Sequence, residues 1–282
     1  MSISIHRRRD LQPSQVSELN SALAAYYTNP PASYYATANN AAAHYTPEVQ
    51  PFHCDLVSRV QPGMDFLELG CGTAHLCQHV EARGAHYTGL DYSAGLLAEN
   101  RRRFQRARFM PIDTDLADRF DFVASLYTIE HVADPPAYLD RLWGFCKPGG
   151  FVAIICPEFV DCECQPPSLF YGQTPRRLRK KLFTFAFEDA WAHFCDLKWN
   201  AMRWQGQART EGPGAFWINL LPRVLHGAEY TIDADAVHFP RLKDLVWWFQ
   251  QRGANIVMTS GTLPRIPAEI LRFNCYVLLQ KP

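Results

Sequence analysis

The stretch Phe66–Leu76, which reads FLELGCGTAHL, organises the rest of the chain. Its apolar beginning predicts a short buried strand that ends abruptly in glycines. Gly70 and Gly72 can adopt backbone angles closed to other residues and let a ligand approach the main chain. Residues 74–83 then carry apolar side chains at helical spacing, up to Gly84. Strand, glycine turn and helix form the first half of a nucleotide-binding βαβ unit, with the helix N-terminus facing the ligand.

The next segment places an acid where such a unit needs one. Residues 85–91 predict a second strand that ends at Asp91, about 20 residues beyond the glycines, where a carboxylate can accept both ribose hydroxyls. The third glycine of a dinucleotide fingerprint is missing, and Ala74 stands near its place. Glu68 lies just before the turn, where its charge would repel a pyrophosphate and attract a cation. The pattern therefore indicates a site for a nucleoside that carries positive charge.

Further motifs continue the series in order: Glu68-Leu69-Gly70-Cys71-Gly72, Gly89-Leu90-Asp91, Asp113, Ser125 to Val132, and Lys147-Pro148-Gly149-Gly150. In this order and spacing the chain resembles the class I S-adenosylmethionine-dependent methyltransferases, of the Rossmann-like, small-molecule type. The resemblance covers residues 60–156, and the terminal helix-and-strands pattern of that family returns after residue 236. It implies S-adenosylmethionine as the cofactor and S-adenosylhomocysteine as the product.

The resemblance also implies roles for individual residues. Glu68 and the Gly70–Gly72 turn would hold the methionine end of the cofactor, Asp91 the ribose and Asp113 the adenine. For Asp113 the plain alternative is a turn-forming aspartate. The full predicted cofactor set is Glu68, Gly70, Cys71, Gly72, Asp91, Tyr92, Asp113, Thr114, Ser125 and Tyr127.

Three residues are candidates for a proton acceptor, if the methylated atom carries a proton: His131, His238 and Tyr35. His131 follows the predicted strand 120–126, at the end of a parallel sheet where ligands bind. Members of the resembled family with different acceptors carry a similar Glu-His-Val, which favours a packing or cofactor-positioning role for His131. Tyr35 belongs to a tyrosine-rich N-terminal region, and its alternative is a tyrosine that covers the core with its hydroxyl in water.

Alternating strand and helix patterns predict an α/β fold. We expect a Rossmann-like, doubly wound sheet of about seven strands, mostly parallel with the last strand antiparallel, and helices on both faces. The predicted core comprises residues 56–157 and 236–282. An N-terminal helical cap is expected over 1–55, with the first 12 residues loosely held. A mainly helical acceptor-binding lid is expected over 158–235.

The end of the chain predicts two strands, at residues 256–258 and 270–279, joined by a turn-rich link short enough for antiparallel pairing. Before them, residues 241–253 predict a helix that ends at a glycine.

Aromatic residues are concentrated in the predicted lid and suggest a mostly apolar or aromatic acceptor. The alternative is that they form a small core of the insert or a dimer surface. Four of the seven tryptophans lie there: Trp191, Trp199, Trp204 and Trp217.

The lid also carries a basic run, Arg176 to Lys181, which could meet an acidic acceptor or carrier but is more often a solvated helix face. Cys162 and Cys164, with Cys195 beyond, lack the second pair of a metal motif, so we expect free thiols and no metal site.

Composition limits the class of partner. The chain has 282 residues, 48% hydrophobic, with equal numbers of acidic and basic side chains, so bulk charge recruits neither nucleic acid nor an acidic membrane. Nine cysteines without framework spacing indicate the reduced thiols of a cytoplasmic protein. The polar residues after Arg7-Arg8-Arg9 predict no signal peptide, and no apolar run is long enough to predict a transmembrane helix.

We therefore expect methyl transfer from S-adenosylmethionine to an oxygen or nitrogen of a small, apolar or aromatic molecule, by a cytoplasmic monomer or homodimer. The protein needs to align the acceptor lone pair with the S–CH3 bond, exclude water and remove any proton, and no metal is required. Three alternatives remain open: a non-catalytic partner with this fold, a methyltransferase for a protein or carrier-bound acceptor, and a nicotinamide oxidoreductase on a similar sheet.

Overall fold

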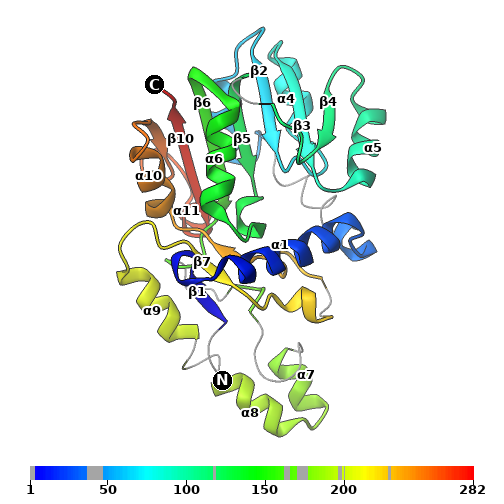
Figure 1. The fold of residues 1–282 in the computed structure, drawn as a ribbon, viewed down its shortest axis with the longest axis vertical. Helices are drawn as coiled ribbons and strands as arrows, with labels where there is room; N and C mark the ends of the chain where they lie inside the picture. Colours follow the sequence, from blue (N-terminus) through cyan, green and yellow to red (C-terminus); the bar gives the residue numbers. More distant parts are fainter. Residues whose placement is uncertain are drawn as a thin grey trace.

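The protein is built on a seven-stranded sheet, and its computed structural model describes residues 4–36, 47–116, 119–161, 166–169, 177–195, 199, 201–227 and 230–282. The strands are β2 (Asp65–Leu69), β3 (His86–Asp91), β4 (Arg108–Pro111), β5 (Phe120–Leu126), β6 (Cys146–Pro157), β9 (Asn255–Thr259) and β10 (Asn274–Gln280). Their order is β4-β3-β2-β5-β6-β10-β9 (Figure 1). β2 to β6 pair in parallel, whereas β10 is antiparallel to both neighbours. The predicted sheet is confirmed, and its strand order reverses between β2 and β5.

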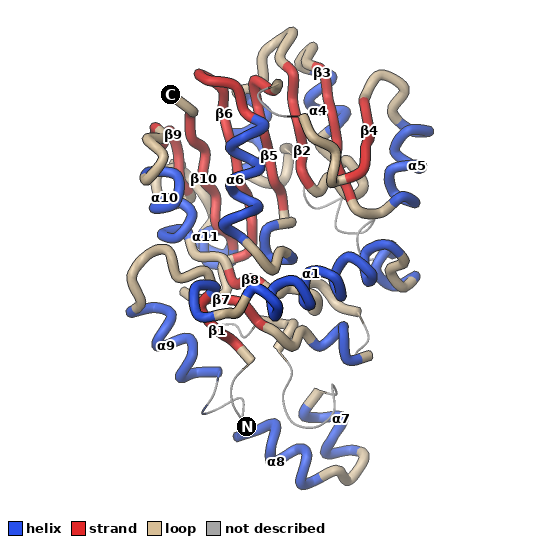
Figure 2. The backbone as a smooth tube through the Cα atoms, in the orientation of Figure 1, coloured by secondary structure: helices blue, strands red, loops and turns tan. Residues whose placement is uncertain are grey.

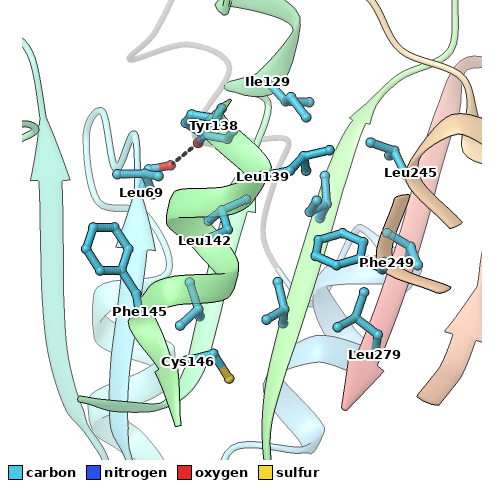
Figure 3. Packing of buried hydrophobic residues seen from close by; sticks show 14 of the residues in the cluster. Leu69, Ile129, Tyr138, Leu139, Leu142, Phe145, Cys146, Leu245, Phe249 and Leu279 are labelled. Carbon is cyan, nitrogen blue, oxygen red and sulfur yellow. Dashed lines mark hydrogen bonds between the residues drawn. The ribbon is translucent and has the colours of Figure 1, made fainter. Parts of the chain in front are cut away.

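Helices cover both faces of this sheet, because successive side chains of a strand point to opposite sides. Leu69 packs in one core with Leu142 and Phe249 (Figure 3), and Leu67 belongs to the same core. Phe66, which precedes Leu67 in β2, belongs to the other core. The first core is covered by α6 (Pro135–Phe145) and α10 (Leu242–Gln250). The second is covered by α3 (Pro51–Ser58), α4 (Cys77–Ala82), α5 (Ala94–Arg103) and α11 (Ala268–Phe273).

The final strand begins later than the sequence suggests. Residues 270–273, predicted as strand, are the end of α11, which starts after Pro267. Proline fixes its own φ near the helical value and suits a position at a helix start. The apolar residue Ile270 packs against the second core from this helix, so an apolar run that looked like a strand is partly helical.

A second, three-stranded antiparallel sheet joins the N-terminus to the middle of the chain. It consists of β1 (Ile5–Arg7), β7 (Trp217–Asn219) and β8 (His238–Phe239) in the order β1-β7-β8. Ile5 and Leu11 are buried, and Arg8 forms an ion pair with Asp134 at 2.7 Å. The prediction that the first residues are loosely held is therefore wrong for residues 4–12. The strand partner of Ile5 and the ion-pair partner of Arg8 lie more than 100 residues away in the sequence, where no local pattern shows them.

One helix of the predicted cap and three helices of the predicted lid lie beyond the carboxyl ends of the parallel strands. α1 (Pro13–Thr28) passes across that edge, and α7 (Leu178–Phe183), α8 (Phe187–Cys195) and α9 (Met202–Thr210) lie farther from the sheet (Figure 2). Among the helices of the described residues, none is both long and apolar enough to cross a membrane.

The aromatic residues of the lid fall into two groups. Trp204 and Trp217 are buried in a small core with Phe239, as the alternative reading of the sequence expected. Trp191 and Trp199 are exposed. Two of the four tryptophans therefore pack in the small core and the other two face solvent, so these residues do not form an acceptor pocket among the described residues.

The basic run of the lid is mostly a solvated helix face. Arg179 and Lys180 are exposed, whereas Lys181 is buried and pairs with Asp189 at 3.3 Å. Arg176, Cys162, Cys164 and Tyr45 lie outside the described residues. The described cysteines are free thiols: Cys54, Cys71, Cys77, Cys146, Cys156, Cys195 and Cys275.

Candidate active site

A cavity of about 410 Å³ lies at the carboxyl ends of β2, β3 and β5, where the strand order reverses. α1 and residues 230–233 close it on the side opposite the sheet. Ligands of open parallel sheets bind at this position. The cavity has two ends, which we call the cofactor end, around Gly70 and Asp91, and the acceptor end, around Tyr27 and His131.

The glycine turn forms the floor of the cofactor end. Gly70 has φ +80° and Gly72 has φ +50°, angles that favour glycine. A Cβ atom at Gly70 would lie 2.3 Å from Cγ2 of Thr128, so the position has no room for a side chain. The amide groups of Gly70 and Cys71 both donate to the carbonyl of Leu90, at 2.8 and 2.9 Å. The turn is therefore held to β3 by backbone contacts.

Asp91 is fixed by the same kind of contact. Its Oδ2 accepts a hydrogen bond from the Gly72 amide, and its Oδ1 accepts one from the Ser93 amide, both at 2.8 Å. Burial raises the pKa of Asp91, and these backbone hydrogen bonds oppose that rise. Each carboxylate oxygen keeps a second lone pair. The two oxygens can therefore accept two hydroxyl groups of a ligand in the cavity.

Glu68 lies at the end of β2 and is fully buried. Its carboxylate accepts a hydrogen bond from the hydroxyl of Tyr87 on β3. Burial raises the pKa of Glu68 to about 8, although the Tyr87 hydrogen bond opposes this shift. A cation bound in the cavity would favour the ionised carboxylate, because opposite charges stabilise the charged form.

Most of the predicted cofactor set lines this cavity. The lining includes Glu68, Gly70, Cys71, Gly72, Asp91, Tyr92 and Tyr127. Asp113, Thr114 and Ser125 are not part of the lining that the described residues form. Asp113 is exposed, and Thr114 donates its hydroxyl hydrogen to the Pro111 carbonyl at 2.7 Å. Ser125 is buried against Tyr138, at 2.9 Å between their hydroxyl oxygens.

Several lining residues had no signal in the sequence. Tyr138 donates a hydrogen bond to the carbonyl of Leu69 at 3.0 Å (Figure 3), which ties α6 to the end of β2. Arg141, one turn farther along α6, and His75 also reach the cavity. In the sequence, Tyr138 and Arg141 match an ordinary amphipathic helix, so only the packing of α6 on the sheet identifies them.

The acceptor end contains a cluster of ionisable side chains around His131. Its Nε2 lies 3.7 Å from Oε1 of Glu130, and its Nδ1 lies 3.6 Å from Oδ1 of Asp235. Asp235 also accepts a hydrogen bond from the Tyr27 hydroxyl at 2.7 Å. Asp233 lines the cavity beside them. From this group the sequence places Glu130 and His131 beyond the strand 120–126, and only His131 is a candidate proton acceptor.

Burial and mutual repulsion shift the pKa values in this cluster. Burial raises the pKa of Glu130 to about 8 and that of Asp233 to about 6, against the attraction of His131. For His131, burial alone would lower the pKa, but the carboxylates of Asp235, Glu130 and Asp233 outweigh it and raise the value. The three carboxyl groups outnumber the single imidazole in this cluster, so a positively charged ligand would be stabilised there.

The other two predicted proton acceptors lie outside the cavity lining that the described residues form. His238 is fully buried, its Nδ1 lies 3.1 Å from the Ile129 carbonyl, and burial lowers its pKa to about 3. His238 is therefore a core residue in this fold, and the expectation that it reaches the acceptor is not supported. The Tyr35 hydroxyl lies 3.4 Å from Oγ of Ser93, beside the start of α5.

Other tyrosines occupy the place expected for Tyr35. Tyr27, Tyr34 and Tyr230 line the acceptor end. The rings of Tyr34 and Tyr230 meet edge to face with centroids 5.2 Å apart, and those of Tyr27 and Tyr34 with centroids 6.0 Å apart. Such pairs present a rigid aromatic wall to a bound molecule.

Comparison with known proteins identifies one family. The model of the methyltransferase domain family matches residues 43–259. A ubiquinone biosynthesis O-methyltransferase of Nitrobacter winogradskyi is 34% identical over 98 residues, which cover 32% of this chain and 38% of the relative. A second ubiquinone biosynthesis O-methyltransferase, from a Bradyrhizobium species, is 33% identical over 100 residues, which cover 33% of this chain and 39% of the relative. The chain thus matches about two fifths of these relatives.

Two solved structures share the fold over most of the chain. The first is an S-adenosylmethionine-dependent methyltransferase from Mesorhizobium loti, with a TM-score of 0.54 at 17% identity. The match covers 84% of this chain and 99% of that protein. The second is a 1,6-didemethyltoxoflavin N1-methyltransferase from Burkholderia thailandensis, solved with 1,6-didemethyltoxoflavin and S-adenosylhomocysteine bound. Its TM-score is 0.55 at 14% identity, and the match covers 94% of this chain and 90% of that protein.

Proposed function

Because the chain belongs to the methyltransferase domain family, we propose that it transfers the methyl group of S-adenosylmethionine to an oxygen or nitrogen of a small, largely apolar or aromatic molecule. The family match covers most of the chain, and the strand order is that of the class I S-adenosylmethionine-dependent fold. The proposal concerns the acceptor and the residues that act on it.

One observation carries the assignment of the cofactor end: Asp91, Glu68 and the Gly70–Gly72 turn line one end of a single cavity. We assign the ribose hydroxyls to Asp91, whose two oxygens each keep a lone pair. We assign the cationic part of the cofactor to the neighbourhood of Glu68, which gains from a positive partner. The adenine contact of Asp113 stays a prediction, since Ile112 rather than Asp113 lines this part.

The acceptor end supports the proposed substrate class. Its wall is aromatic and aliphatic, formed by Tyr27, Tyr34, Tyr230, Leu23 and Ile232. Pockets for small molecules combine such apolar walls with a few placed polar groups, here His131 and its neighbours. Two relatives named as O-methyltransferases and one neighbour named as an N-methyltransferase agree with an oxygen or nitrogen acceptor.

The chemistry requires alignment above all. The acceptor lone pair attacks the methyl carbon in line with the S–CH3 bond, so that the C–S bond breaks as the new bond to the acceptor forms. The positive charge on sulfur is lost, S-adenosylhomocysteine leaves, and any acceptor proton goes to a base or to water. The cavity holds the two reactants against each other, which contributes most when the reacting atoms are prepositioned.

A protein or carrier-bound acceptor, or binding without turnover, is the alternative function. A cavity of about 410 Å³ suits a small molecule beside the cofactor better than a polypeptide segment. The described cysteines are free thiols, which agrees with the cytoplasmic location that we propose from the sequence.

Calorimetry with S-adenosylhomocysteine tests the cofactor end. We expect binding by the unmodified chain and about 100-fold weaker binding by Asp91→Ala, since loss of two hydrogen bonds to a charged group costs about 3 kcal/mol or more. Asp115→Ala is the matched control, an exposed acid outside the cavity lining to which no cofactor contact is assigned, and we expect little change. A chain that binds neither S-adenosylmethionine nor its product would overturn the proposal.

Labelled methyl transfer to a panel of phenols, catechols and aromatic amines then tests the acceptor class. Transfer to one group of the panel supports the proposal. Cofactor binding with transfer only to a protein substrate would favour the alternative.

A further inference from the structure

We propose that Glu130, His131 and Asp233 bind a divalent metal cation at the acceptor end, and that this cation holds the hydroxyl oxygen of the acceptor. The inference rests on the proposed function and deepens it, because it selects oxygen over nitrogen as the methylated atom. The sequence predicted no metal site, because Cys162 and Cys164 lack the second pair of a metal motif.

The geometry of the three side chains suits a metal ion. Glu130 and His131 belong to η2 (Ile129–His131), which follows β5, and Asp233 comes from the loop before β8. One ligand atom from each residue lies within 4.8 Å of the others. All three residues line the cavity. Two carboxylates and an imidazole form a donor set that divalent transition metals accept.

The lack of hydrogen bonds to Glu130 among the described residues points to a missing ligand. Glu130 is fully buried, and neither carboxylate oxygen has a hydrogen-bond partner among the residues that the structure describes. Nε2 of His131 lies 3.7 Å from Oε1 of Glu130, which is within ion-pair range but too far for a hydrogen bond. Burying a carboxylate without a partner is costly. A proton on Glu130 would not remove this cost, because the resulting O–H would also need an acceptor.

The neighbouring residues are placed as they are around metal-bound histidines. A histidine ligand usually directs its second ring nitrogen to a carboxylate. Here Nδ1 of His131 lies 3.6 Å from Oδ1 of Asp235, an ion-pair distance longer than a hydrogen bond, and Nε2 lies 3.7 Å from Oε1 of Glu130. Asp235 is held in turn by the Tyr27 hydroxyl at 2.7 Å. We therefore assign Nε2 as the metal-binding atom and Asp235 as the positioning residue for the ring.

Three protein ligands leave positions on the metal open toward the cavity, as in catalytic rather than structural sites. A hydroxyl bound there loses its proton more readily, because the cation stabilises the oxygen anion. In the resulting step the acceptor O–H bond breaks and the proton passes to water. The oxygen then attacks the methyl carbon as the S–CH3 bond breaks, which gives a methyl ether and S-adenosylhomocysteine. The acceptor class is thus a small aromatic molecule that bears a hydroxyl group.

Metal binding by the full chain tests this inference. After removal of metals with a chelator, Mn²⁺ and Zn²⁺ are titrated separately by calorimetry, and Mn²⁺ is also followed by its electron paramagnetic resonance signal. We expect one cation per chain. Glu130→Gln and Asp233→Asn should each weaken binding by about 100-fold or more, and Asp235→Asn by about 10-fold to 100-fold as a positioning change.

Asp115→Asn is the control, because this exposed acid lies outside the cavity lining and has no assigned contact to the cofactor. S-adenosylhomocysteine binding is measured on every variant, and its retention shows that the chain is folded and the cofactor end intact. Absence of stoichiometric cation binding in a chain that binds S-adenosylhomocysteine overturns the metal site and leaves the methyltransferase proposal standing. Cation binding that persists unchanged in Glu130→Gln and Asp233→Asn also overturns it. Loss of S-adenosylhomocysteine binding in the unmodified chain contradicts the proposed function instead.

Discussion

The cofactor end and the acceptor end of the cavity are built in different ways. The floor of the cofactor end, with Glu68 and Asp91, comes from one continuous run of chain, β2 to the start of α5. Its shape is set by hydrogen bonds from backbone amides to the Leu90 carbonyl and the Asp91 carboxylate. The acceptor end joins α1, η2 and the loop before β8, with Tyr27 and Asp235 separated by 208 positions. The first end depends on main-chain geometry, and the second on side chains that can change without altering the fold.

The largest effect is expected from a side chain added to the glycine turn. Gly70→Ala places a Cβ atom 2.3 Å from Thr128 in a left-handed backbone conformation, so strain and overpacking together cost about 2–5 kcal/mol. We expect the loss of measurable S-adenosylhomocysteine binding and a lower melting temperature, by calorimetry and thermal unfolding.

Gly63→Ala is the matched control for this change. Gly63 has φ +82°, close to that of Gly70, but a Cβ atom there would meet nothing within 4 Å. It should show the backbone strain alone and keep normal cofactor affinity. Equal behaviour of the two variants would contradict the view that the turn leaves no space for a side chain.

A medium effect is expected from the charge of Glu68. Burial raises its pKa to about 8, so the carboxyl of the unliganded chain carries a proton at neutral pH. S-adenosylmethionine favours the ionised form, so binding should release a proton and strengthen with pH, by up to about tenfold per pH unit, until pH 8. Calorimetry in two buffers of different ionisation enthalpy measures this release.

Two variants sharpen the Glu68 prediction. Glu68→Gln should abolish the proton release, and S-adenosylhomocysteine, which lacks the sulfonium charge, should release less than S-adenosylmethionine. Tyr87→Phe removes the hydrogen bond that lowers the pKa of Glu68, so the midpoint of the pH dependence should move upward. The folded chain also binds this proton more tightly than the unfolded one, so stability should fall between pH 4.5 and 8. A pH-independent affinity would remove Glu68 from the cationic site.

The smallest effect is expected from a hydroxyl at the acceptor end. Tyr27→Phe removes the hydrogen bond to Asp235, which should cost about 1 kcal/mol of folding stability and leave S-adenosylhomocysteine affinity unchanged. Tyr26→Phe is the control, because the neighbouring Tyr26 hydroxyl is buried without a partner among the described residues. If Tyr27→Phe weakens cofactor binding as strongly as Gly70→Ala, the two ends are not separate.

The errors of the sequence analysis share one physical cause. His238 looked like an acceptor residue because it precedes α10, but its ring packs beneath Ile129. Residues 4–12 looked loose because they are polar, although Ile5 and Leu11 pair and pack with distant segments. For Trp204 and Trp217 the sequence left a substrate pocket and a small core of the insert both open, and the structure shows the small core. In each case the decisive partner lies far away in the sequence.

By itself, the sequence determined the doubly wound sheet, the glycine turn and the acids Glu68 and Asp91. These depend on strand periodicity, glycine φ angles and hydrogen bonds between near neighbours, which a local pattern records. Only the tertiary structure decided that Asp233 and Asp235 join Glu130 and His131, and that Tyr27 and Tyr34 rather than Tyr35 face the cavity. Those contacts arise because separate segments bury their side chains against one another, and that packing leaves no periodicity in the chain.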